Sequence, residues 1–291
     1  MLMAAPHRWL VPQDNGFSVA SAHTEPPKNH EKTNYWKDNL ELEAKKLGDW
    51  QHRLYADGRH AILLVFQAMD AAGKDSTIRH VFAHVNPCGL NAVSFKQPSP
   101  LELSHDFLWR TTAELPARGE ISVFNRSYYE EVLVVRVHPE LLAAQRVPEA
   151  ASDALWMERL RAIAEYERFL AQQGTVILKF WLNVSRKEQR QRFLDRIDEP
   201  DKRWKFRSAD LRERDCWAAY AAAYESCLNA TSRPWAPWYA IPADDKPYMR
   251  WQVAKLINET FEQLGIAFPE PTAADVADLE QARNRLMAEK D

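Results

Sequence analysis

The chain has 291 residues, 46% hydrophobic and 27% charged, which suffices to bury the core of one α/β domain or of two small ones. Its formal charge of −3 argues against general nucleic-acid binding, and no apolar run approaches the roughly 20 residues of a membrane helix. Three cysteines without metal-ligand spacing and the lack of a signal-peptide stretch indicate free thiols and a cytoplasmic protein.

The first 30 residues contain four prolines and show neither helical nor strand periodicity. We interpret residues 1–30 as a tail that is partly ordered by docking, and residues 31–291 as the folded domain. A helix is predicted over 34–55, because apolar residues recur there at helical spacing before Asp57-Gly58 ends the pattern.

Short apolar runs then alternate with helical patterns. Such runs are typical of central parallel strands that are covered on both faces, so we predict a parallel sheet in a three-layer α/β/α fold. The predicted strands are 61–66, 92–95, 121–124, 176–181 and 238–241. The predicted helices between and after them are 75–84, 101–115, 127–136, 152–172, 186–197, 209–230, 247–264 and 272–289.

A phosphate-binding loop is predicted after the first strand, where the chain reads QAMDAAGKDSTI. The stretch resembles the P-loop pattern G-x-x-x-x-G-K-[ST], in which small residues let backbone N–H groups approach phosphate and the lysine adds charge. Ala68 replaces the first glycine and Asp75 replaces the Ser/Thr, so an ordinary strand–helix turn is the alternative. The expected phosphate ligands are Ala71, Ala72, Gly73, Lys74, Asp75, Ser76 and Arg79.

An acidic residue, Asp70, lies inside the loop. A carboxylate next to phosphates is repelled unless a cation lies between them, and Mg²⁺ commonly binds one or two carboxylates together with phosphate oxygens and waters. We therefore expect Asp70 to contact Mg²⁺, directly or through water, with Mn²⁺ as the alternative metal.

Polar residues also follow the second and third predicted strands. Asn125 and Arg126 follow the third, at the position where P-loop enzymes carry a metal-binding acid, and Lys96 follows the second. Ligands gather at the carboxyl ends of parallel strands, so Arg126 is placed to stabilise charge on a phosphoryl group in transfer. Asn125 and Glu130 are candidate binding residues. The alternative for Arg126 is a surface side chain at a strand end.

Residues 179–214 contain twelve Lys or Arg and seven Asp or Glu, a local charge of +5 in a negatively charged chain. The tract is either a solvated pair of helices or a surface for a polyanion. We predict a lid at about 185–215 that closes over phosphates. Its candidate polyanion ligands are Arg186, Arg192, Arg196, Lys202 and Lys205.

Five stretches together are similar to the polyphosphate kinase 2 family, and specifically to its class III branch. They read LLVFQAMDAAGKDSTIRHVF, SFKQPSPLELSHDFLWR, LPARGEISVFNRSYYEEVLVVRVHP, SRKEQRQRFLDRIDEPDKRWKF and TSRPWAPWYAIPADDK, and the resemblance spans about 34–268. It implies a thymidylate-kinase-like P-loop fold with a helical lid. It also implies Mg²⁺-dependent phosphate transfer between polyphosphate and nucleoside phosphates, with both AMP and ADP as acceptors.

The resemblance carries over to individual positions. Asp70 and Lys74 match the family's loop acid and lysine, and Arg126 matches the arginine after its second motif. Many members carry an aspartate at the position of Asn125, but an asparagine there fits the class III pattern. Ala68 replaces a glycine that is frequent in the family. The matching lid positions are Arg192, Arg196 and Lys205.

The predicted catalytic residues are therefore Asp70, Lys74 and Arg126. The expected partners are polyphosphate, AMP, ADP and ATP, with guanine nucleotides as further candidates, but neither nucleic acid nor membrane. We expect a homo-oligomer, either a dimer or a tetramer. Two other functions fit the same residues: a nucleotide kinase with ATP as donor, and a non-catalytic P-loop or polyanion-binding module. The sequence leaves open the direction of transfer, the polyphosphate length and the base selectivity.

Overall fold

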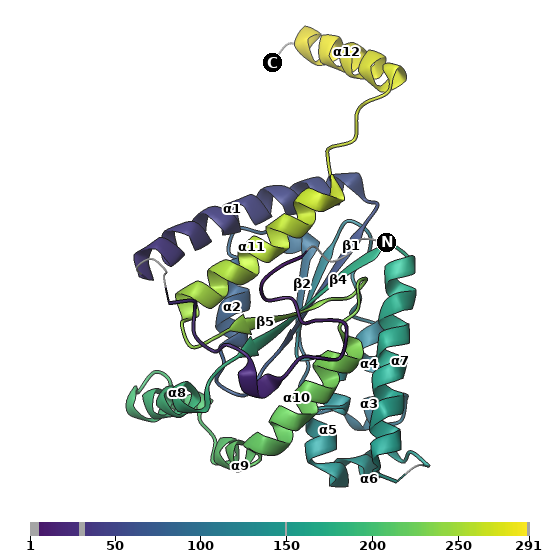
Figure 1. Cartoon of the computed structure of the whole chain (residues 1–291). Coiled ribbons are helices and arrows are strands. Elements are labelled where there is room, and N and C mark those ends of the chain that lie inside the picture. The colour runs from purple at the N-terminus through teal and green to yellow at the C-terminus, as the bar shows by residue number, and fades with distance from the viewer. Residues whose placement is uncertain (1–5, 29–32, 149, 290–291) are drawn as a thin grey trace.

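The computed structural model describes residues 6–28, 33–148 and 150–289, apart from the side chain of Thr33 (Figure 1). Five parallel strands form the central sheet in the order β2-β3-β1-β4-β5. This confirms the predicted α/β fold and all five predicted strands. The strands are β1 (Ala61–Gln67), β2 (Leu90–Ser94), β3 (Ile121–Asn125), β4 (Thr175–Asn183) and β5 (Trp238–Pro242).

Helices cover both faces of the sheet. On one face α1, α2 and α11 pack against apolar side chains such as Leu64 and Phe180, and on the other α7 and α10 pack against Leu63 and Trp181. The helices are α1 (Thr33–Asp57), α2 (Lys74–Val81), α3 (Pro100–Leu103), α4 (Trp109–Thr112), α5 (Val134–Val137), α6 (Leu142–Gln145), α7 (Asp153–Gln172), α8 (Arg186–Asp198), α9 (Ala209–Asp215), α10 (Trp217–Thr231), α11 (Lys246–Leu264) and α12 (Ala273–Ala288).

Burial along the strands explains why they could be recognised. Every residue of β1 and β5 is buried, because both faces of these strands are covered, whereas the edge strand β2 is partly exposed. The register aligns Phe66 of β1 with Asn125 of β3 and Gln67 with Trp181 of β4. The carboxyl ends of the three central strands therefore meet at one edge, where the phosphate loop begins.

Three predicted helices are interrupted. The helix predicted over 101–115 consists of α3 and α4, because the Asp106 carboxylate accepts the N–H groups of Leu108 and Trp109 and starts a new turn there. The one predicted over 127–136 is a 3₁₀ turn, η3 (Tyr128–Glu131), followed by α5. The one predicted over 209–230 is divided between α9 and α10.

The described part of the N-terminal segment, residues 6–28, packs against the body. Val11 donates its N–H to the carbonyl of Trp238 at 2.9 Å, and Ala240 donates to the carbonyl of Trp9 at 2.8 Å, so this segment runs beside β5. Residues 1–5 and 29–30 of the predicted tail lie outside the described residues.

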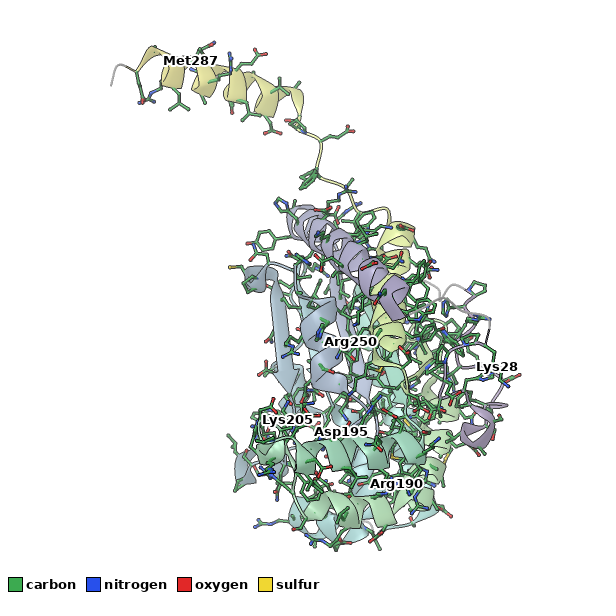
Figure 2. All side chains as sticks on the ribbon, turned by 90° about the vertical axis from the view of Figure 1, so that its left-hand side faces the viewer. Lys28, Arg190, Asp195, Lys205, Arg250 and Met287 are labelled. Carbon is green, nitrogen blue, oxygen red and sulfur yellow. The ribbon has the colours of Figure 1, made fainter. Side chains whose placement is uncertain are left out.

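At the other end, α12 stands away from the body (Figures 1 and 2). In the part of the chain that the structure describes, no helix is both long and apolar enough to span a bilayer.

Candidate active site

The loop from Ala68 to Gly73 connects β1 to α2 in a tight turn. Ala71 and Gly73 have positive φ angles of 59° and 109°, and Ala72 donates its N–H to the carbonyl of Met69 at 3.3 Å. Among the described residues no side chain caps the start of α2. The first N–H groups of a helix have no acceptor within the helix, so this end offers them, with the positive end of the helix dipole, to an anion.

Lys74 is the first residue of α2, and its side chain folds back over the loop. Its Nζ donates to the carbonyl of Ala68 at 3.0 Å. Burial in the loop, together with the nearby guanidinium of Arg126, lowers the pKa of Lys74 to about 8. A negatively charged phosphate that binds in the loop would stabilise the protonated form of this amine.

Arg126 lies beside the loop in a strained backbone conformation. Its φ is 63°, a left-handed value that costs energy for a side chain with a Cβ, and its N–H donates to the carbonyl of Phe66 at 3.0 Å. Its guanidinium forms ion pairs with Asp70 at 3.0 Å and Glu130 at 3.2 Å. Glu130 foremost, and then Asp70, raise the pKa of Arg126, and Gln67 donates to Glu130 at 3.0 Å.

Asp75, which replaces the Ser/Thr of the P-loop pattern, contacts Asn125, which stands where P-loop enzymes carry a metal-binding acid. Asn125 donates its side-chain N–H to the carboxylate of Asp75. The hydroxyl of Ser76 donates to the carbonyl of Gly73 at 2.9 Å. The carboxylate that a P-loop enzyme usually carries at a strand end is here on α2, with a neutral amide opposite it. Carboxylate and amide oxygens are both ligands that suit Mg²⁺.

Arg192, a predicted polyphosphate ligand, makes its hydrogen bonds within the protein in this structure. The residue is 4% exposed, and each nitrogen of its guanidinium donates a hydrogen bond. The acceptors are the Glu188 carboxylate at 2.8 Å and the carbonyls of Ala71 (3.1 Å), Ala72 (2.6 Å), Ala243 (2.6 Å) and Asp244 (3.1 Å). In this conformation Arg192 holds the loop in place and has no N–H left for a polyphosphate.

The contacts of Arg196, Lys202 and Lys205 are with residues of the lid. Arg196 pairs with Asp210 at 3.6 Å and Lys202 pairs with Glu199. The Nζ of Lys205 lies 5.1 Å from the ring centre of the exposed Trp204 in η5 (Arg203–Lys205). Three further predicted binding residues, Arg79, Lys96 and Arg186, are exposed.

A cavity of about 240 Å³ opens between the loop, Arg126, the lid helices α8 and α9, and the start of α10. Gln189 forms part of its wall, donating to the carbonyl of Asp70 at 2.9 Å and accepting from Arg214 at 2.7 Å. The sequence analysis did not identify Gln189 as a site residue. It missed other lining residues, because helices rich in alanine and charge gave no sign of facing the loop: Asp210, Glu213, Arg214, Trp217 and Tyr220.

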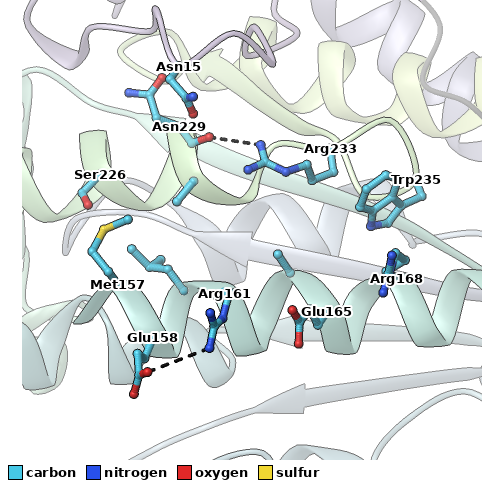
Figure 3. Close-up of a pocket in the computed structure, with 13 residues that line it drawn as sticks. Asn15, Met157, Glu158, Arg161, Glu165, Arg168, Ser226, Asn229, Arg233 and Trp235 are labelled. Carbon is cyan, nitrogen blue, oxygen red and sulfur yellow. Dashed lines mark hydrogen bonds and ion pairs between the residues drawn. The ribbon is translucent and has the colours of Figure 1, made fainter. Parts of the chain in front are cut away.

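A larger cavity of about 740 Å³ lies between α7 and α10 (Figure 3). None of the predicted site residues lines it. Arg161, one of its cations, contacts Glu158 of the same helix at 3.9 Å, and Arg233 donates to the carbonyl of Asn229 at 3.3 Å. The larger cavity lies against the middle of α7 and the end of α10. The smaller cavity borders the phosphate loop and Arg126 and is therefore the candidate active site.

Known proteins resemble this chain over most of its length. A family model described as Polyphosphate kinase 2 matches residues 29–268. An ADP-polyphosphate phosphotransferase of Rhodopseudomonas palustris is 52% identical over 260 residues, which are 89% of this chain and 90% of the relative. An AMP/ADP-polyphosphate phosphotransferase of Meiothermus ruber is 48% identical over 230 residues, 79% of this chain and 82% of the relative.

A solved structure has the same fold. The crystal structure of polyphosphate kinase 2 from Arthrobacter aurescens TC1 superimposes with a TM-score of 0.83 at 35% sequence identity. The match covers 96% of this chain and 99% of the other chain.

Proposed function

The chain belongs to the polyphosphate kinase 2 family, and from this premise we propose that it transfers phosphate between inorganic polyphosphate and adenosine mono- or diphosphate. The observation that carries the proposal is the convergence of Lys74, Arg126 and the exposed N–H groups of α2 on one loop. Two relatives that match most of this chain bear names for this reaction.

The chemistry of the acceptor suits these residues. A phosphate acceptor is already anionic near neutral pH, since its second pKa is about 6, so it needs charge neutralisation and alignment more than a base. Lys74 and the helix start would bind the phosphoryl group being transferred, and Arg126 would stabilise charge that spreads over its oxygens. Asp70 and Glu130 hold the guanidinium of Arg126 from two sides, which limits its reorganisation during transfer.

A divalent metal fits the loop. Asp75 carries an exposed carboxylate next to the Asn125 amide, and Asp70 lies across the loop in contact with Arg126. We propose Mg²⁺, with Mn²⁺ as the alternative, held by one of these carboxylates and by substrate phosphates. When bound, the metal would neutralise phosphate charge.

Replacing Asp70 with asparagine tests the metal contact. We expect turnover to fall about tenfold or more, together with a similar rise in the Mg²⁺ concentration that gives half-maximal rate. Rates measured across a Mg²⁺ titration check this, with Asp75→Asn as the competing candidate and the lid variant Asp201→Asn as the control. Wild-type Mg²⁺ dependence in Asp70→Asn would show that Asp70 does not contact the metal.

The pKa of Lys74 predicts how the rate depends on pH. Since this pKa is lowered to about 8, the amine is protonated below that pH and neutral above it, and only the protonated form attracts phosphate. We expect kcat/KM for the donor to fall as pH rises through about 8, while kcat persists to higher pH because bound phosphate raises the pKa. Rate profiles from neutral to alkaline pH check this, and Lys74→Arg should remove the decline. An unchanged decline in Lys74→Arg would assign it to another group.

One set of incubations tests the proposed function. The protein is mixed with polyphosphate and Mg²⁺, and AMP, ADP, GMP or GDP is added separately. We expect adenine nucleotides to gain phosphate without any ATP being supplied. Transfer that requires ATP would favour a nucleotide kinase, and binding without turnover would favour a non-catalytic module. Products with GMP or GDP would extend the substrates to guanine nucleotides.

A further inference from the structure

Three cations gather where α2 meets α11, beside the phosphate loop but outside the cavity near Arg126. Arg79 comes from α2, and Lys246 and Arg250 come from the first two turns of α11. Figure 2 shows Arg250 on the same face of the molecule as Arg190 and Lys205, above α8. None of the three lines the cavity that holds Asp70 and Arg126.

The start of α11 packs directly on the loop. A Cβ added to Gly73 would lie 3.3 Å from the Cε of Met249 and 3.8 Å from a guanidinium nitrogen of Arg192. The hydroxyl of Thr77 lies 3.9 Å from the Met249 sulfur. Since Lys246 and Arg250 are one helical turn apart and flank Met249, they border the loop on its α11 side.

These cations are not held in direct ion pairs. Among the described residues, Arg79, Lys246 and Arg250 form no ion pair within 4.0 Å, and the Nε of Arg250 is buried without a hydrogen-bond partner. Nearby acids are engaged elsewhere: Glu188 pairs with Arg192, Asp195 accepts from Gln191, Asp244 accepts from the N–H of Ser185, and Asp245 accepts from the N–H of Tyr248.

The cations also repel one another. Burial first, and then the charges of Arg79 and Arg192, lower the pKa of Arg250. Burial first, and then Arg192, lower the pKa of Lys246, to which Arg250 contributes as well. Lys246 and Arg250 are half-buried and Arg79 is exposed. Glu188 and Asp195 offset part of the repulsion at Lys246, and a bound anion would offset the remainder.

We infer that Arg79, Lys246 and Arg250 form a subsite for the distal phosphates of a polyphosphate chain whose end lies in the phosphate loop. This inference rests on the proposed function and adds to it the path of the donor. A chain of many phosphates can span from the loop to the α11 side, whereas the two phosphates of ADP are too few to fill both places. The cavity beside Arg126 is a less favourable path for a long anion, because Asp70, Glu130, Asp210 and Glu213 line it.

Chain length therefore distinguishes this subsite from the loop. We expect Lys246→Gln and Arg250→Gln to raise KM for long-chain polyphosphate about tenfold each, the scale of one charge-assisted contact. KM for tripolyphosphate and for ADP should change far less. By analogy with nucleic-acid binding, each lost cation should also reduce by about one the slope of log affinity against log salt for the long chain.

Lys255→Gln is the matched control, because Lys255 is on α11 but pairs with Glu259 at 3.7 Å. Arg79 is exposed, whereas Lys246 and Arg250 are half-buried. If Lys246→Gln or Arg250→Gln does not fold, Arg79→Gln provides the same comparison of long and short donors. Equilibrium binding of long-chain polyphosphate, measured by calorimetry, provides a readout apart from turnover. Equal effects on long and short donors, or no effect on the long one, would overturn the subsite. If the wild-type protein transfers no phosphate from polyphosphate, the proposed function itself fails.

Discussion

Replacing Lys74 with alanine is expected to lower phosphate transfer by about a hundredfold or more, the scale of losing one charge contact in a transition state. Lys74 begins α2 and folds over the loop to the Ala68 carbonyl, where a bound phosphate would meet it. The hydrogen bond of the amine is to a carbonyl and not to a carboxylate. Its removal therefore takes a positive charge from the site without leaving an acid unpaired at hydrogen-bond distance.

The fold should survive this substitution. Thermal unfolding of Lys74→Ala should match that of the wild type, and the control Lys96→Ala, which changes an exposed cation after β2, should keep near-normal rates. Rates of product formation with both substrates saturating give the comparison. Near-normal turnover in a folded Lys74→Ala protein would contradict the phosphate-loop interpretation.

The largest loss of stability is expected at Lys179, which is fully buried beneath η3. Its Nζ donates to the Glu167 carboxylate, to the Tyr129 hydroxyl at 2.9 Å and to the Thr231 carbonyl at 2.8 Å. Glu167 also accepts from the hydroxyls of Tyr128 and Tyr129 at 2.9 Å each. Since η3 begins two residues after Arg126, this buried network fixes the segment that follows this arginine.

Lys179→Met should lower the free energy of unfolding by about 3–5 kcal/mol, because it leaves the Glu167 carboxylate buried without its cation. The double variant Lys179→Met/Glu167→Leu should lose less, since both charges are then absent. Chemical denaturation of the two variants checks this order, with the exposed Lys255→Met as reference. If Lys179→Met lowers the free energy of unfolding no more than Lys255→Met does, the buried pair of Lys179 and Glu167 contributes little to stability.

The sheet could be predicted because its strands are mainly apolar. β1, β4 and β5 are buried on both faces, so the sequence shows them as continuous hydrophobic runs. The short helices could not be predicted as well, since their ends depend on single polar side chains. Asp106, for example, starts a new turn inside a stretch whose apolar spacing alone suggests one helix.

The loop residues of the site could be predicted because the motif places them next to one another in sequence. Asp70, Lys74 and Arg126 do lie together in the structure. The role of Arg192 could not be predicted, because its acceptors include carbonyls after β5 that only the tertiary fold brings near. Lys246 and Arg250 were also missed. In the sequence they belong to an ordinary helix start, and only the tertiary fold brings that helix start to the loop.

Phosphate transfer from polyphosphate to ADP in a buffer free of ATP tests the central claim most directly. ATP and the remaining polyphosphate are measured over time with purified protein and Mg²⁺. The account predicts that each ATP formed corresponds to one phosphate unit lost from polyphosphate, and that no ATP forms when polyphosphate is left out. ATP formation that continues without polyphosphate and yields equal AMP would contradict it, since ADP would then be both donor and acceptor.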